Sequence, residues 1–154
     1  MKAIRPLPLV AFAVVAGVVG WFVNVMVARE GWPAIRFPWS AALTMGVLCL
    51  VAVGFGWGVY RTRTGKAPRA VEPLVAARVL VLGQACAHAG AVVAGWHAGV
   101  LAASGLAAGA GMSQTVVASL VMTGCGLALV GCGILVEYFC RIPPDEGEGL
   151  EPHR

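Results

Sequence analysis

Charged side chains are scarce in this sequence. They make up 12% of the 154 residues, compared with about 25% in a typical soluble domain. From Val79 to Val136, 58 consecutive residues contain no Asp, Glu, Lys or Arg. A soluble domain of this size could not keep such a run away from water, whereas two helical crossings of a bilayer, at about 20 residues each, fit inside it. The lack of charge therefore excludes a water-soluble fold and predicts an integral membrane protein.

Paired cysteines and reactive clusters are also lacking. None of the five cysteines has C-x-x-C spacing, and all are expected at membrane depth or on the cytoplasmic side: Cys49, Cys86, Cys125, Cys132 and Cys140. Buried cysteine usually packs as a small apolar side chain. We therefore expect no disulfide, no metal site and no cofactor. No catalytic constellation is recognisable, so we do not expect an enzyme.

Long apolar runs are what the sequence does contain. Outside the first run, Pro6–Ala28 and Phe37–Tyr60 are also free of charge, and each could form one helical span. The predicted fold is therefore an all-α membrane protein with four transmembrane helices, forming a single domain over residues 1–154. The spans are expected at about 7–28, 39–60, 76–101 and 115–138.

The first span also resembles a signal peptide, because Lys2 and Arg5 precede the apolar run. Signal peptides have apolar regions of about 7–15 residues that end at a small-x-small cleavage site. Here the run is 23 residues long, and Met26 stands where a small residue is needed. We expect a retained membrane anchor.

The basic residues predict the orientation. Two of them, Arg29 and Arg36, lie in the first loop, and the third loop, Ala102–Gln114, has no charge. By the positive-inside rule, both termini and the second loop are cytoplasmic, as expected in the cytoplasmic (inner) membrane. Eight basic residues lie on that side: Lys2, Arg5, Arg61, Arg63, Lys66, Arg69, Arg141 and Arg154.

The net charge of +4 does not indicate a nucleic-acid partner. The basic residues are spread along one membrane face, where they meet anionic lipid headgroups. The tail, 142–154, is rich in proline and acidic residues and has little apolar surface to bury, so we expect it to be disordered. The lipid bilayer is therefore the one partner that the charge pattern predicts.

Small residues recur every four positions along the third span. Such a ridge lets another helix approach closely, because packing of small residues drives helix association in lipid. We predict that it is a helix-packing face, with the partner left open between another span and a second subunit. Single pairs, such as Gly54 with Gly58, are attributed to composition. The ridge consists of Gly83, Ala87, Ala91, Gly95 and Gly99.

Two polar residues of the third span, Gln84 and His88, share one helix face near mid-depth. They could form an interhelical hydrogen bond, for instance with Ser119 or Thr123, or a proton or ligand site. The structural explanation is favoured, because no acidic residue is expected at the same depth. His97 lies beside Trp96 and is expected at the membrane interface.

Arg78 and Glu137 flank the uncharged run, and antiparallel neighbouring spans would bring them to similar depth. An ion pair between them is one interpretation. In the other, Arg78 extends to the headgroups and Glu137 pairs with Arg141, four residues later on the same helix. Both interpretations give these residues a structural role.

Three short motifs stand out in the second half of the sequence. They are Ala77-Arg78-Val79, Ala94-Gly95-Trp96 with Gly99, and the closing run from Glu137 to Pro144. With these motifs the chain resembles a known family of actinobacterial membrane proteins, domain-of-unknown-function family 3180. The resemblance covers nearly the whole chain. It implies a small four-span protein of the cytoplasmic membrane, often encoded beside folate-biosynthesis genes, and it assigns no catalytic or binding residue.

Two classes of function follow. The first is a non-enzymatic accessory or scaffolding component that packs through the ridge onto a membrane-protein partner or forms a homo-oligomer. The alternative is an oligomeric small transporter or channel. Spans one and two contain no ionisable residue, whereas four-span multidrug transporters resembling this layout carry a carboxylate in the first span, where only Asn24 is polar here. The first class is therefore favoured.

Overall fold

The computed structural model describes residues 6–32, 39–63, 73–107 and 113–140. These residues form four helices and no strand: α1 (Pro6–Arg29), α2 (Trp39–Arg63), α3 (Pro73–Ala107) and α4 (Gln114–Cys140). All four are long and apolar enough to cross a membrane. The predicted all-α architecture with four spans is confirmed. The expected disordered tail, 142–154, lies outside the described residues, and the cytoplasmic location of both termini stays a prediction.

The third helix is longer than predicted. We expected a span over 76–101, but α3 contains 35 residues and the connection to α4 is correspondingly short. Pro73 suits the first position of a helix, where no backbone N–H is needed, and Ala102 and Ala103 favour its continuation. A transmembrane span is limited by the bilayer thickness, whereas a helix can extend beyond the span into the interface.

Gly31, just after the end of α1, has a left-handed backbone conformation. Its φ is 72°, its N–H donates to the Ala28 carbonyl at 3.2 Å, and the N–H of Trp32 donates to the Val27 carbonyl at 3.2 Å. These two bonds are those of the Schellman motif, which satisfies the last carbonyl groups of a helix. The backbone therefore turns sharply at the end of α1.

Replacing Gly31 with alanine should lower the free energy of unfolding by about 1 kcal/mol, because a Cβ atom is unfavourable at positive φ. The new Cβ would meet nothing within 4 Å, so the cost is confined to the backbone. Gly46→Ala is the matched control, since Gly46 lies within α2 and also has nothing within 4 Å. Thermal unfolding in detergent should show a decrease for the first variant alone.

Several polar side chains bond within their own helices. Thr44 Oγ1 donates to the Ser40 carbonyl, Ser104 Oγ to the Val100 carbonyl and Thr123 Oγ1 to the Ser119 carbonyl, each at 2.8 Å. These hydroxyl groups therefore need no partner from another helix to satisfy their donors in lipid. Helix association relies correspondingly more on close packing.

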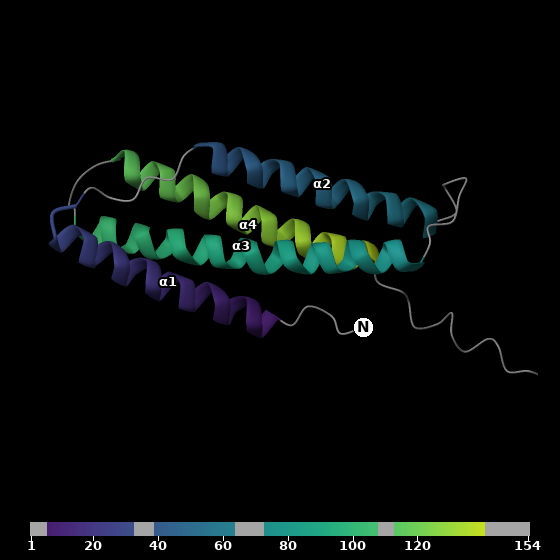
Figure 1. Cartoon of the computed structure of the whole chain (residues 1–154), viewed down its shortest axis with the longest axis horizontal. Helices are drawn as coiled ribbons and strands as arrows, with labels where there is room; N and C mark the ends of the chain where they lie inside the picture. Colours follow the sequence, from purple (N-terminus) through teal and green to yellow (C-terminus); the bar gives the residue numbers. More distant parts are fainter. Residues whose placement is uncertain (1–5, 33–38, 64–72, 108–112, 141–154) are drawn as a thin grey trace, which may run out of the picture.

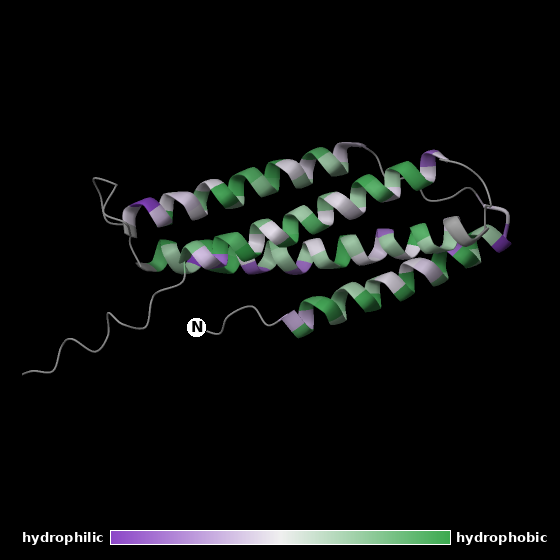
Figure 2. Cartoon of the chain, turned by 180° about the vertical axis from the view of Figure 1, so that it is seen from behind, coloured by the Kyte–Doolittle hydropathy of each residue, from purple (hydrophilic) through white to green (hydrophobic). Residues whose placement is uncertain are grey.

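Helices α3 and α4 form a central antiparallel pair (Figure 1). α1 packs along α3, while α2 packs along α4 and also touches α3. The helices carry apolar residues around most of their surface (Figure 2). Leu129 and Val136 of α4 are the largest fully buried side chains. The core therefore lies along the α3–α4 contact, and α1 and α2 flank it.

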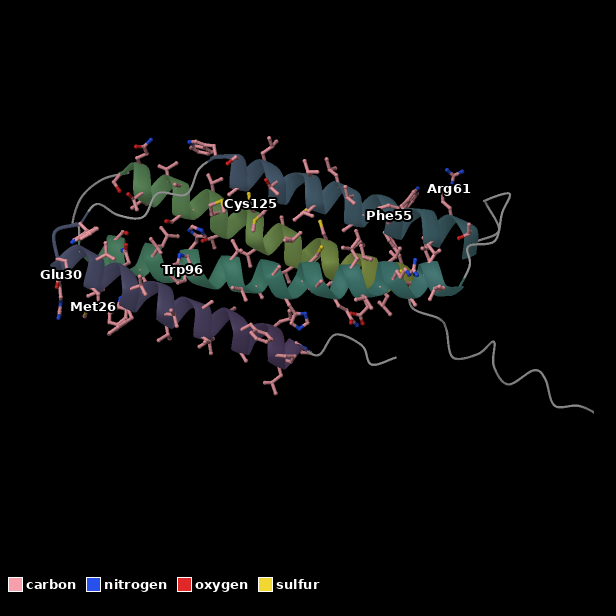
Figure 3. The ribbon with its side chains drawn as sticks, in the orientation of Figure 1. Met26, Glu30, Phe55, Arg61, Trp96 and Cys125 are labelled. Carbon is pink, nitrogen blue, oxygen red and sulfur yellow. The ribbon has the colours of Figure 1, made fainter. Side chains whose placement is uncertain are left out.

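The two flanking helices are displaced toward opposite ends of the central pair (Figure 1). Leu9, near the start of α1, packs against Ala87 and Ala91, near the middle of α3. Val59, near the end of α2, packs in one cluster with Val79, near the start of α3. We call the two ends of the molecule the Arg29 end and the Arg61 end. In Figure 3, the label Glu30 marks the Arg29 end and the label Arg61 marks the Arg61 end. α1 thus covers the half of α3 toward the Arg29 end.

Candidate functional site at the Arg29 end

The small-residue ridge of α3 is covered by other helices of the same chain. A Cβ on Gly83 would lie 2.8 Å from Val136 Cγ1 of α4. Cβ atoms on Gly95 and Gly99 would overlap the carbonyl oxygens of Ala13 and Gly17 in α1. Ala87 and Ala91 between them are fully or almost fully buried. The described neighbours of the ridge are therefore α4 at one end and α1 at the other.

Helix geometry explains why one ridge contacts two helices. Each residue advances by about 100°, so each four-residue step rotates the ridge by about 40° around the helix. The four steps from Gly83 to Gly99 add up to about 160°. A row of this length cannot face one neighbour throughout. The row thus presents two successive faces to two helices of the same chain, and contact with a second subunit stays a prediction.

Other glycines complete the α3–α4 contact, and the spacing analysis did not identify them. A Cβ on Gly90 would lie 2.6 Å from the Gly126 carbonyl oxygen, and one on Gly126 would lie 2.7 Å from Ala94 N. By contrast, Gly124 of α4 has nothing within 4 Å. Gly126 and Gly133 are seven residues apart, a spacing that places them on one face. That spacing is the signal in the sequence that could have indicated them.

The His88 side chain forms a hydrogen bond within α3, to the backbone carbonyl of Gln84. The Nδ1 of His88 lies 2.7 Å from the Gln84 carbonyl oxygen, and because a carbonyl only accepts, Nδ1 carries the hydrogen. The His88 ring also packs edge-on against Phe12 of α1, with centroids 5.7 Å apart. The expected bond to Ser119 or Thr123 is not the one formed: Thr123 bonds the Ser119 carbonyl instead.

Arg78 precedes Val79 in sequence and Glu137 follows Val136, and these two valines belong to one core cluster. Arg78 and Glu137 therefore lie at the same end of the molecule, the Arg61 end. Arg78 is exposed and Glu137 is half-buried, while Arg141 lies outside the described residues. The ion pair stays a prediction.

The cysteines gather between α2, α3 and α4. Cys86 is buried in the core, and Cys49 and Cys140 pack against the same core. Within the described residues, no group of three or more His, Cys, Asp or Glu side chains is placed to hold a metal ion. The thiols here act as packing groups.

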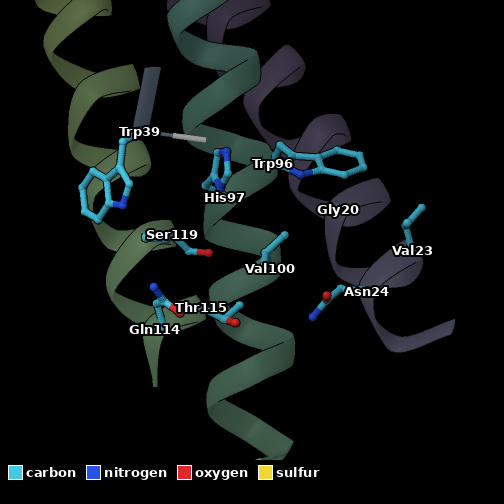
Figure 4. Close-up of a pocket in the computed structure, with 11 residues that line it drawn as sticks. Gly20, Val23, Asn24, Trp39, Trp96, His97, Val100, Gln114, Thr115 and Ser119 are labelled. Atoms are coloured by element: carbon cyan, nitrogen blue, oxygen red, sulfur yellow. The ribbon is translucent and has the colours of Figure 1, made fainter. Parts of the chain in front are cut away.

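A pocket lies between the helices toward the Arg29 end, and we call it the deep pocket. Its volume is about 180 Å³, and all four helices contribute to its wall. Figure 4 shows Asn24 of α1 on one side of α3, with Ser119 and Thr115 of α4 on the other. The polar side chains that line it are Asn24, His97, Gln114, Thr115 and Ser119.

Aromatic and small residues complete the wall. Trp39, at the start of α2, and Trp96 of α3 both line the deep pocket. Gly20 also lines it, and a Cβ there would lie 2.6 Å from the Trp96 carbonyl oxygen. Glycine therefore allows α1 to approach α3 closely at the pocket wall. Without that close approach, Asn24 would stand farther from the residues of α4.

His97 is enclosed by other helices of the chain. Its side chain is only 5% exposed, and its Nδ1 atom is buried. Ser119 beside it in the pocket is 4% exposed. Residues of α1, α2 and α4 surround this part of α3, an enclosure that the sequence of α3 alone does not indicate. The expected position of His97 at the membrane interface stays a prediction.

A second, more open cavity adjoins the first, and we call it the rim pocket. Its volume is about 430 Å³. Asn24 and Thr115 line both cavities, so the two are neighbours. Arg29 and Trp32 also line the rim pocket. Among the described lining residues, the basic side chain thus belongs to the rim pocket and not to the deep pocket.

Four apolar helices around a small polar pocket define a multi-pass membrane protein with a potential ligand site. The family model for a "Protein of unknown function (DUF3180)" matches residues 9–144. The chain therefore belongs to that family, and the resemblance seen in its motifs is confirmed. Searches of curated proteins and of solved structures gave no match.

Proposed function

We propose that this protein is a non-enzymatic accessory component of the cytoplasmic membrane, which binds a ligand or a group of a partner in the deep pocket. The observation that carries this proposal is the chemistry of the pocket wall: its described side chains offer hydrogen bonds and carry no Asp, Glu, Lys or Arg. Binding, rather than conversion or transport, is the use that this wall supports best.

The lining gives little support to catalysis. Nucleophilic or acid–base mechanisms use a reactive group oriented by a neighbouring base or carboxylate. Among the lining side chains that the structure describes, His97 is the single titratable group, accompanied by amides, hydroxyls and two indoles. Such groups fix the orientation of a ligand and its specificity.

The helix packing favours a pocket that is closed toward the Arg61 end. There α3 and α4 meet at Gly90 and Gly126 with no room for a Cβ, and α1 meets α3 at Ala13 and Gly95. A solute would need these contacts to open before it could pass along the helices of one chain. An accessory role is therefore favoured over transport.

Under this proposal a partner would not dock on the small-residue ridge of α3. The small-residue ridge is already in contact with α1 and α4, so a partner would meet another surface. The deep pocket and its mouth lie at the end that the positive-inside rule assigns to the outer face. A partner or ligand at that face is the one the geometry favours.

Photo-crosslinking in native membranes would test the proposal. We expect a benzoylphenylalanine at Val23, which lines the deep pocket, to capture one specific molecule or protein. The matched control is the same substitution at Val18, which lies on α1 with 61% of its surface exposed. Capture at both positions alike would contradict the proposal.

Flux and turnover measurements complete the test. Proteoliposomes containing the purified chain should neither transport nor convert the molecule captured at Val23. Saturable movement of that molecule across the vesicle membrane would assign the alternative function, a small transporter. Formation of a product would assign an enzyme.

A further inference from the structure

We infer that the deep pocket and the rim pocket together bind an elongated organic anion that enters from the aqueous side. Its uncharged, hydrogen-bonding end lies beside His97 and Ser119, and its carboxylate or phosphate lies beside Arg29. This inference rests on the proposed binding function and specifies the class of ligand.

The two cavities are neighbours that share wall residues, and the inferred ligand spans both. Asn24 of α1 and Thr115 of α4 line both, so a ligand that extends past them occupies both. Asn24 offers a carbonyl oxygen and an amide N–H group, and Thr115 offers a hydroxyl. These groups can bond the middle of a ligand whichever polar atoms it presents.

Charge differs along the site. Among the described residues that line the deep pocket there is no Asp, Glu, Lys or Arg, whereas Arg29 lines the rim pocket. Ser113, whose Oγ accepts a hydrogen bond from Val116 N at 3.3 Å, also lines the rim. It marks the N-terminus of α4, where the helix dipole is positive. The neighbouring Glu30 is exposed and does not line either cavity.

The distance along α1 sets the length of the ligand. Gly20 lines the deep pocket and Arg29 lines the rim. Nine residues of helix separate them, which corresponds to about 14 Å along the axis. The Arg29 side chain shortens this span, because helical side chains lean toward the N-terminus. A ligand of about 10 Å between its polar ends fits the site.

The polar interior favours a soluble anion over a phospholipid. An anionic lipid with its phosphate at Arg29 would direct its acyl chains toward the membrane interior. Chains in the deep pocket would cover Asn24 and Thr115 without bonding them, and covering polar groups without offering them a hydrogen bond is costly. A ligand with a hydroxyl or amide at its inner end avoids that cost.

Binding of a matched set of probes would test the inference. We choose 4-(4-hydroxyphenyl)butanoate, which has both polar ends, its primary alcohol, which lacks the anion, and 4-phenylbutanoate, which lacks the hydroxyl. Affinities are measured by calorimetry on the full chain in phosphatidylcholine nanodiscs. The complete probe should bind at least tenfold more tightly than either analogue, since each loses one buried polar contact.

Variants assign the two ends of the probe. Arg29→Gln should weaken binding of the acid about tenfold and leave the alcohol unchanged, whereas Ser119→Ala should weaken the acid and leave 4-phenylbutanoate unchanged. Arg61→Gln, at the opposite end, is the control. Equal affinities for the three probes, or an equal loss with Arg29→Gln and Arg61→Gln, would overturn the inference.

The lipid composition separates the two sources of an anion. Affinity for the complete probe should be the same in nanodiscs of phosphatidylcholine and of phosphatidylglycerol. If the probe binds in phosphatidylcholine but not in phosphatidylglycerol, and if Arg29→Gln removes this difference between the two lipids, the site binds a lipid headgroup. That result would overturn the inference of a soluble ligand. Absence of probe binding alongside specific capture at Val23 would reject this inference while the proposed function stands.

Discussion

Replacing Gly90 with leucine should separate α3 from α4 and give the largest loss of stability of any single substitution considered. A Cβ at this position would lie 2.6 Å from the Gly126 carbonyl oxygen and 2.9 Å from Val130 N. Both are backbone atoms, which cannot rotate away, so the two central helices must move apart. We expect a decrease of about 3 kcal/mol in the free energy of unfolding, the upper part of the range for overpacked cores.

Gly131→Leu is the matched control for this prediction. Gly131 lies on the same central pair, within α4, but has nothing within 4 Å. Unfolding by sodium dodecyl sulfate in mixed micelles, followed by circular dichroism, should shift to lower detergent fractions for Gly90→Leu alone. Equal midpoints for both variants would show that α3 and α4 do not approach each other at Gly90.

Replacing Gly95 with leucine should detach α1 from α3 while the central pair remains assembled. The new side chain would overlap the carbonyl group and the Cα atom of Ala13 in α1. Helix α1 has no comparable contact with another described helix. Spin labels at the exposed positions Val14 and Ala98 would report the separation by pulsed electron paramagnetic resonance in a cysteine-free background. The interlabel distances should become longer and broader.

Gly124→Leu serves as the control, because nothing lies within 4 Å of Gly124 in α4. An unchanged distance distribution in Gly95→Leu would contradict the α1–α3 contact. The prediction also changes how a binding experiment is interpreted. If Gly95→Leu abolishes assembly with a partner, the cause is the loss of α1 from the fold, and with it one wall of the deep pocket.

The number and approximate position of the helices could be predicted, because charge is the main barrier to burial in lipid. The absence of charge between Val79 and Val136 was enough to place two spans. Their ends could not be predicted equally well. The span estimate for α3 stopped at 101, although the helix continues to Ala107, because interfacial residues tolerate both helix and loop.

The neighbours of each helix were harder to predict, because helices that are apolar on all sides carry little directional information. The four-residue spacing indicated that Gly95 and Gly99 pack closely, but not that they meet α1 while Gly83 meets α4. The pocket depends on this arrangement. Asn24, His97 and Ser119 are far apart in sequence, and only the assembled helices bring them to one cavity.

The opposite displacement of α1 and α2 has a consequence for the lipid around the protein. A bilayer core is about 30 Å thick, whereas the 35 residues of α3 extend over about 52 Å. With α1 toward one end and α2 toward the other, the apolar belt is higher on one side of the molecule than on the opposite side. Lipid must therefore meet the two sides at different levels, by tilt of the protein or by a local change in bilayer thickness. Hydrophobic mismatch thus follows from the arrangement of the helices.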